Sequence, residues 1–267
     1  MHLIHDLVVR HLASSSLFQP SLIGAAALIY LGRLSRVELP IVDTFVAKLA
    51  DLRNALVAQG ARVAEVALRA VESYFERDLN KARTVVAGDE LIDRVDVEIE
   101  RASIPLLSMG ETDEHAIRSV LTFVKVNNEL ERIADLAVNI AEVTLDSGQT
   151  TEMVPATFRV MANSVIGMLR DANKALAVAD VMLAERVLGF DDTVDRFKNE
   201  ISLDAQQKVA TGEFGVKFAF RLMTVVKSLE RIADHCTNVC EQVIYLESGQ
   251  IVRHLPEGWT KPAKPAL

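Results

Sequence analysis

The stretch Glu230–Glu241, Glu-Arg-Ile-Ala-Asp-His-Cys-Thr-Asn-Val-Cys-Glu, decides the fold of this chain, because most of it also stands at Glu131–Glu142. The earlier copy has the sequence Glu-Arg-Ile-Ala-Asp-Leu-Ala-Val-Asn-Ile-Ala-Glu. The first residues of the two copies lie 99 positions apart. Such similarity at a fixed spacing indicates that one structural unit is present twice.

The similarity extends upstream of the motif, where the matching residues lie 102 positions apart: Asp78 with Asp180, Ala82 with Ala184, Asp89 with Asp191, Asp93 with Asp195 and Glu98 with Glu200. The spacing falls from 102 to 99 before the motif is reached. The second unit is therefore expected to be three residues shorter between its second and third helices.

Composition favours a helical protein. Half of the 267 residues are hydrophobic, which is enough for one large or two small domains, and aromatic residues make up only 5%. Glycine and proline are scarce within long stretches, as in helices. A net charge of −8 argues against a nucleic-acid groove, which needs a basic surface.

Helix start and stop signals predict three helices in each unit. In the first unit they run from about Thr44 to Arg77, from Asp78 to Leu107 with Pro105 bending or ending the helix, and from Thr112-Asp113 to Gly148. In the second unit the signals are Pro155, Asp180 and Thr211-Gly212. We predict an all-α fold of two tandem antiparallel three-helix bundles, 44–148 and 153–249, rather than a rod, since no strict heptad is present.

The two ends of the chain differ from these bundles. The apolar run Leu22–Leu31 is about half of the roughly 20 residues that span a bilayer, and no basic signal-peptide region precedes it. Residues 1–40 are predicted to be an extra helix or a poorly ordered leader, with peripheral membrane contact as the alternative. Residues 250–267 are predicted to be a tail because they are rich in proline.

Two cysteines, Cys236 and Cys240, lie four residues apart in one predicted helix, where a disulfide has nothing to connect. We expect two small buried side chains in a cytoplasmic protein, with thiolate metal ligation as the alternative.

Each motif places acidic and amide groups along one face of its helix, because residues advance by about 100° each. These are Glu131, Asp135, Asn139 and Glu142 in the first copy, and Glu230, Asp234, Asn238 and Glu241 in the second. The opposite face is apolar and should be the core: Val126, Leu130, Ile133, Ala137 and Ile140, then Leu229, Ile232, Ala233 and Val239.

We call the acidic face of each motif helix its acidic stripe. In each unit the helix before the motif also carries acids, which would face this stripe. The first unit has Asp89, Asp93, Asp96 and Glu100, and the second has Asp191, Asp192 and Asp195, with Lys198 and Ser202 at the later positions. The alternative explanation for the aspartates after Gly88 and near Gly189 is a helix that starts again, with acids in its first turn.

Carboxylates four residues apart on a helix repel by about 0.2–0.5 kcal/mol per pair, so a compensating charge is expected. The adjacent Arg132 and Arg231 provide it in one explanation, and in another the stripes are merely solvated surface. Otherwise the stripes bind a cation, since carboxylate oxygens are ligands for magnesium, manganese, calcium or iron. The two sites need not bind a cation equally well, because the helix before the second motif carries fewer acids.

The doubled Glu-x-x-x-Asp motif within Leu-Glu-Arg-Ile-Ala-Asp, the Gly-Asp-Glu-Leu-Ile-Asp before it and the Gly-Gln-Ile-Val-Arg-His at the end resemble the PhoU family of phosphate-response regulators. The resemblance covers about residues 44–254. It implies two three-helix bundles, multinuclear metal clusters of iron, manganese, magnesium or zinc, and no catalytic activity. It also implies a homodimer that contacts the ATPase of the phosphate ABC transporter and the phosphate-sensor histidine kinase, and so reaches the membrane through its partners.

Carried onto this chain, the resemblance assigns the metal ligands to Glu131 and Asp135, to Glu230 and Asp234, and to Asp93 and Asp195 as their partners. One departure is Leu136, which stands where the second copy has His235 and the family often has histidine. Two other classes stay open, namely a ferritin-like metalloenzyme, which would need Glu-x-x-His pairs, and a helical adaptor that binds basic surfaces without metal.

Overall fold

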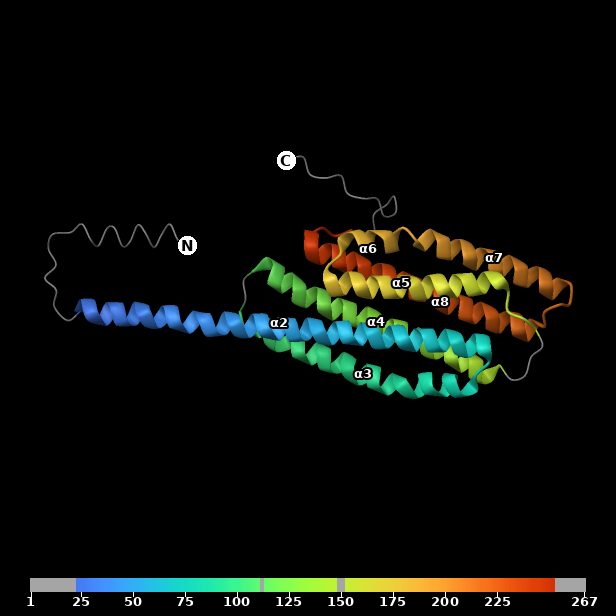
Figure 1. Ribbon diagram of the computed structural model, residues 1–267, viewed down its shortest axis with the longest axis horizontal. Coiled ribbons are helices and arrows are strands. Elements are labelled where there is room, and N and C mark those ends of the chain that lie inside the picture. The colour runs from blue at the N-terminus through green and yellow to red at the C-terminus, as the bar shows by residue number, and fades with distance from the viewer. Residues whose placement is uncertain (1–22, 111–112, 148–151, 253–267) are drawn as a thin grey trace, which may run out of the picture. The chain divides into compact units, whose positions relative to one another are not determined.

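The structure is a computed structural model, which describes residues 23–110, 113–147 and 152–252. All regular structure in these residues is helical (Figure 1). The helices are α2 (Ile23–Glu76), α3 (Leu79–Ser108), α4 (Glu114–Asp146), α5 (Ala156–Val178), α6 (Val181–Leu188), α7 (Asp191–Ala210) and α8 (Val216–Ser248). The predicted all-α class is confirmed.

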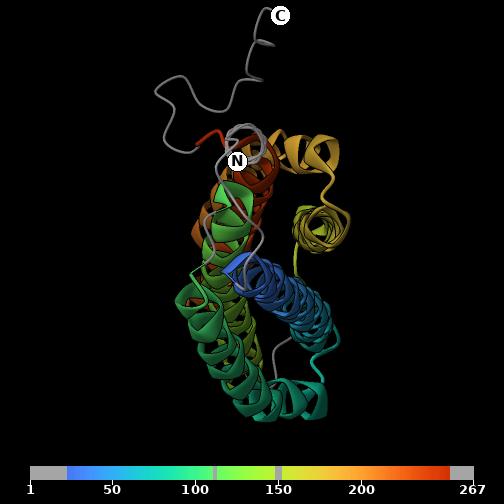
Figure 2. The same cartoon turned by 90° about the vertical axis from the view of Figure 1, so that its left-hand side faces the viewer.

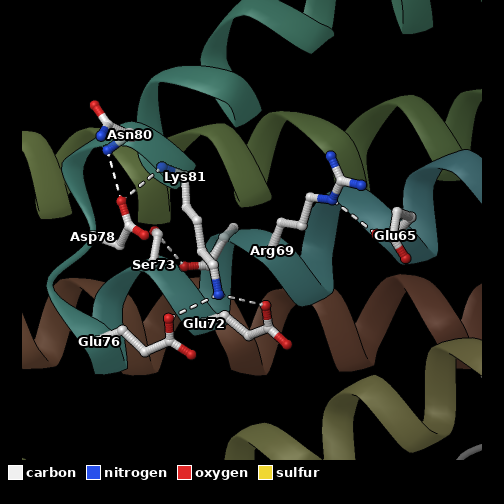
Figure 3. A network of polar contacts seen from close by, with 9 residues as sticks. Glu65, Arg69, Glu72, Ser73, Glu76, Asp78, Asn80 and Lys81 are labelled. Atoms are coloured by element: carbon white, nitrogen blue, oxygen red, sulfur yellow. Dashed lines mark hydrogen bonds and ion pairs between the residues drawn. The ribbon is translucent and has the colours of Figure 1, made fainter.

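The break between α2 and α3 forms because Asp78 caps the new helix. Its carboxylate accepts hydrogen bonds from the backbone N–H groups of Asn80 (2.8 Å) and Lys81 (3.0 Å), as Figure 3 shows. The Lys81 ammonium reaches back to Glu76 (2.7 Å) and Glu72 (3.1 Å) of α2. Asp180 caps α6 in the same way, so both copies of this aspartate act as predicted.

One helix boundary differs from the prediction. The helix α2 begins at Ile23 rather than Thr44, and Pro40 lies within it. One proline removes a single backbone hydrogen bond, and the helix continues beyond it. The helical alternative therefore holds for residues 23–40 of the predicted leader, whereas residues 1–22 lie outside the described part. Pro105 also lies inside its helix, which ends three residues later.

The second helix of the second unit is divided, whereas a single helix was predicted. It ends at Leu188 and starts again at Asp191, with Asp191 and Asp192 in the first turn of α7. Acidic residues there interact favourably with the helix dipole. The alternative of a restarting helix thus holds near Gly189 but not at Gly88, where α3 continues without interruption.

From Ala47 onward, the described residues of the two repeated units form one compact body. Within it α3 packs on α4, α5, α6 and α7 pack on α8, and α4 packs on α8. Figure 2 views these helices nearly end-on. The repeated motif helices therefore pack against each other and form the seam between the units.

The first helices of the two units also meet. The Arg53 guanidinium donates to the carbonyl of Ala177 (2.9 Å), and the Asn173 amide donates to that of Gly60 (2.7 Å). A Cβ at residue 60 would lie 2.6 Å from Asn173 Oδ1, so this approach requires glycine.

The core is the predicted one. Every apolar residue assigned to the inner faces of the motif helices is at most 1% exposed. Cys236 and Cys240 are buried and free, as predicted, and burial raises the pKa of both thiols. In the part of the chain that the structure describes, no helix is long and apolar enough to cross a membrane.

Candidate functional site: two facing carboxylate clusters

The acids of α3 and α4 face each other and form what we call the first cluster: Asp89, Asp93 and Asp96 of α3 with Glu131, Asp135 and Glu142 of α4. Burial raises the pKa of Asp89, and the charges of Asp93, Asp135 and Glu142 raise it further. Partial burial and Asp135 likewise raise the pKa of Glu131, against the effect of Arg132. Such mutual influence requires the two helices to present their acids to the same space.

Two observations describe the balance of charge in the first cluster. Arg132 contacts Glu131 (3.4 Å) and Asp135 (3.7 Å). These contacts agree with the explanation that the adjacent arginine neutralises the acidic stripe. The Arg132 side chain is 54% exposed, so this compensation is weak. Asp89 Oδ1 is buried and has no hydrogen-bond partner among the described residues. A buried oxygen of this kind is a vacant acceptor for a cation or a water molecule.

Asp96 is held in place by α4. The Asn127 side-chain amide donates to its carboxylate (2.6 Å) and to its backbone carbonyl (3.0 Å). Burial raises the pKa of Asp96, and Glu100 and Asp93 add to the effect. Asp96, one of the acids predicted on the preceding helix, is therefore bonded directly to α4.

The second cluster consists of Asp191 and Asp195 of α7 with Glu230 and Asp234 of α8. Partial burial, followed by Glu230, Asp191 and Asp195, raises the pKa of Asp234 to about 6. Burial also raises the pKa of Asp191, and the charge of the exposed Asp192 contributes.

A lysine makes the second cluster different from the first. Lys198 Nζ lies 2.6 Å from Asp195 and 2.9 Å from Glu230, and these contacts raise the pKa of the lysine. Lys198 stands at the position that Asp96 holds in the first unit, 102 residues earlier. The second cluster thus contains its own cation where the first has another carboxylate.

Two residues of the second motif lie at the seam between the units. His235 Nδ1 is 2.6 Å from Glu129 Oε2, and the Asn238 amide donates to the same oxygen (3.0 Å). Asn238, which was assigned to the second acidic stripe, therefore contacts Glu129 of α4. Sequence reasoning missed Glu129, since its counterpart in the second unit is Ser228 and the repeat gave no signal.

The chemistry of the clusters suits hard cations, because their donors are carboxylate oxygens. Yet no three His, Cys, Asp or Glu side chains within residues 23–110, 113–147 and 152–252 are arranged to hold a metal ion. The predicted ligands do lie near enough for their charges to act on one another, Asp93 and Asp135 on Glu131, and Asp195 and Glu230 on Asp234. Metal binding by these groups stays a prediction.

Comparison with known proteins gives matches over most of the chain. The family model described as "PhoU domain" matches twice, at residues 57–144 and 158–243. The phosphate-specific transport system accessory protein PhoU homolog 1 of Thermotoga maritima is 32% identical over 192 residues, which are 71% of this chain and 82% of that protein. The Escherichia coli accessory protein PhoU is 26% identical over 79% of this chain and 88% of its own.

Solved structures agree with these matches. The crystal structure of PhoU from Pseudomonas aeruginosa has a TM-score of 0.72 at 27% identity and covers 77% of this chain and 100% of that one. The phosphate transport system regulatory protein PhoU from Streptococcus pneumoniae has a TM-score of 0.73 at 22% identity, with 78% and 99% covered. The tandem helical fold predicted from the repeat is confirmed.

Proposed function

This chain belongs to the PhoU family, and from that premise we propose that it is an accessory protein of phosphate transport that lowers phosphate uptake and phosphate-regulon signalling. It acts by contacting the ATPase of the phosphate ABC transporter and the phosphate-sensor histidine kinase, as a cytoplasmic homodimer. The observation that carries the proposal is the double family match, one over each repeated unit.

The two carboxylate clusters supply metal sites in this proposal. Burial and, after it, repulsion between neighbouring acids raise the pKa of Asp89 and Glu131 in the first cluster, and a bound divalent cation would offset both effects. In the second cluster Lys198 already supplies a positive charge to Asp195 and Glu230. We therefore expect the first cluster to bind metal more tightly than the second.

The arrangement favours a regulator over a metalloenzyme. Ferritin-like sites use Glu-x-x-His pairs that project into a four-helix core. The sequence contains no Glu-x-x-His, and Asp93, Asp195 and Asp234 are exposed at helix surfaces. Oxygen or peroxide consumption by the iron-loaded protein would support the enzyme instead, and its absence supports the regulator.

Deletion of the gene tests the regulatory role. In a host with a phosphate regulon, we expect deletion to raise the expression of that regulon in high phosphate, and the intact gene to restore repression. Repression that is unchanged after deletion would count against the proposal.

Complementation with the Glu131→Ala, Asp135→Ala double variant then distinguishes a regulator that needs bound metal from an adaptor that works without it. Failure to restore repression supports a role for the metal, whereas full restoration by a metal-free variant supports the adaptor that binds its partners without metal.

A further inference from the structure

A groove of about 560 Å³ lies between α4 and α8 and shares only Glu142 with the first cluster. Its charged lining residues are Arg221, Lys227 and Arg231 from α8 and Glu142 and Asp146 from α4. This size falls within the range of small-molecule sites, roughly 300–1,000 Å³. The chain as a whole carries a net charge of −8, so a groove lined by three positively charged side chains is unusual in this acidic protein.

One of the three cations is already paired. Arg221 contacts the Asp146 carboxylate at 2.5 Å and donates to the Ser147 carbonyl (2.8 Å), and its side chain is only 16% exposed. This pair forms a fixed, neutral wall of the groove. Lys227 and Arg231 are exposed and form no ion pair or hydrogen bond within the described residues. With Arg221 and Asp146 paired, the remaining charged lining residues are these two cations and one acid, Glu142, so the groove keeps an excess of positive charge.

The repeat provides a second groove for comparison. The equivalent place in the other half of the seam, lined by Lys125, Tyr245 and Val252 among others, holds only about 40 Å³. Tyr245 stands where the first copy has Asp146, and the Lys125 ammonium lies 5.6 Å from the centre of its ring. The aromatic ring and the chain segment after α8 thus fill the twin.

Positively charged side chains are more numerous in the larger of the two grooves. Arg221 and Lys227 stand where the other copy has Thr122 and Asn128, 99 residues earlier. Arg231 has a counterpart in Arg132, but that arginine contacts Glu131 and Asp135. Open space and two cations that are unpaired among the described residues therefore occur together in one groove, whereas its twin is nearly filled and has one lysine, Lys125, which lies over the Tyr245 ring.

We propose that this groove binds a small molecule that carries a phosphate group, held by Lys227 and Arg231. A guanidinium donates two parallel hydrogen bonds to a phosphate, and an ammonium adds a mobile point charge. The Asn139 side-chain amide also lines the groove and has no hydrogen-bond partner in the described part of the chain, so it supplies a further donor. The site uses no metal and is independent of the proposed regulatory role.

Calorimetric titration of the full chain, freed of divalent cations by a chelator and then dialysed, tests the site. The probes are inorganic phosphate and ATP, which distinguish a free phosphate from a nucleotide. We expect at least one of them to bind at one site per chain. The Lys227→Gln, Arg231→Gln variant should weaken that binding at least about tenfold, because two charged hydrogen-bond donors are lost.

The matched control is Arg170→Gln, Lys174→Gln, which removes the same charge from exposed positions on α5. It should bind the probe as the unmodified chain does, and Lys227→Arg should retain most of the affinity. Circular dichroism checks that each variant is helical. No binding of either probe, equal binding by the groove variant, or an equal loss in the control would overturn the proposal.

Discussion

At the scale of single residues, one exchange between the repeats changes the chemistry of a whole cluster. Asp96 accepts from Asn127 in the first unit, and Lys198 bridges Asp195 and Glu230 in the second. The sequence showed this difference, and we predicted unequal sites from it. It could not show that the lysine contacts both helices, because that depends on how α7 packs on α8.

Removal of this lysine should open the second cluster to metal. In a chain whose first cluster is disabled by Glu131→Ala and Asp135→Ala, Lys198→Met should raise the affinity for manganese on the order of tenfold, since a like charge leaves the site. Lys208→Met is the control, because Lys208 pairs with Asp204 elsewhere on α7 (3.2 Å). Equal manganese affinity with and without Lys198 would show that the lysine does not compete.

The raised pKa of Asp234 predicts a pH-dependent stability. An acid whose pKa rises from 3.8 to about 6 on folding destabilises the folded state when ionised. The penalty is absent below pH 3.8, grows between the two values and is complete above about 6. Asp234→Asn should therefore stabilise the metal-free protein at pH 7.5, by about 1 kcal/mol after allowance for solvent screening.

Urea unfolding at pH 7.5 and at pH 4 measures this effect. The gain should shrink at the lower pH, and Asp51→Asn, an exposed site on α2, should show neither gain nor pH dependence. A stabilisation by Asp234→Asn that is the same at both pH values would contradict the electrostatic cause.

At the scale of helices, capping residues set boundaries that patterns of apolar residues leave open. The chain leaves α8 through Gly249, which has a φ of 72° and lies against the Arg118 guanidinium. By contrast, Gly88 lies inside α3, and a Cβ there would meet nothing within 4 Å. The two glycines therefore have opposite roles, although both are part of the sequence motifs.

Alanine at these two glycines should have opposite effects. Gly249→Ala should destabilise the protein by about 1 kcal/mol or more, because a left-handed residue and a steric clash are combined. Gly88→Ala should stabilise it by about 0.5–1 kcal/mol, as expected inside a helix. Thermal unfolding measures both, and a destabilising Gly88→Ala would show that α3 needs the glycine for another reason.

The seam between α4 and α8 depends on Glu129. Glu129→Ala leaves His235 and Asn238 without their acceptor and should cost about 1.5–3 kcal/mol. The control Glu65→Ala breaks an exposed pair with Arg69 and should cost less than about 0.5 kcal/mol. Denaturant unfolding compares them, and equal losses would mean that the seam contact contributes no more than a surface ion pair.

At the scale of the whole molecule, the repeat predicted two bundles but not how they meet. Self-similarity gives the same inner face to both motif helices, and these faces proved to be the core. It carries no information about contacts between copies, so the pairing of α4 with α8 and the placement of His235 and Asn238 were not foreseen. The start of α2 was missed because the helix continues through Pro40 and begins at Ile23, well before the predicted start at Thr44.

The metal content of the purified protein tests the central claim most directly. Elemental analysis after purification without chelators should find divalent metal in the unmodified chain. Glu131→Ala with Asp135→Ala should remove most of it, and Glu230→Ala with Asp234→Ala should remove less, because Lys198 already partly neutralises the second cluster. A chain that contains no metal, or a first-cluster variant that retains all of it, would contradict the account.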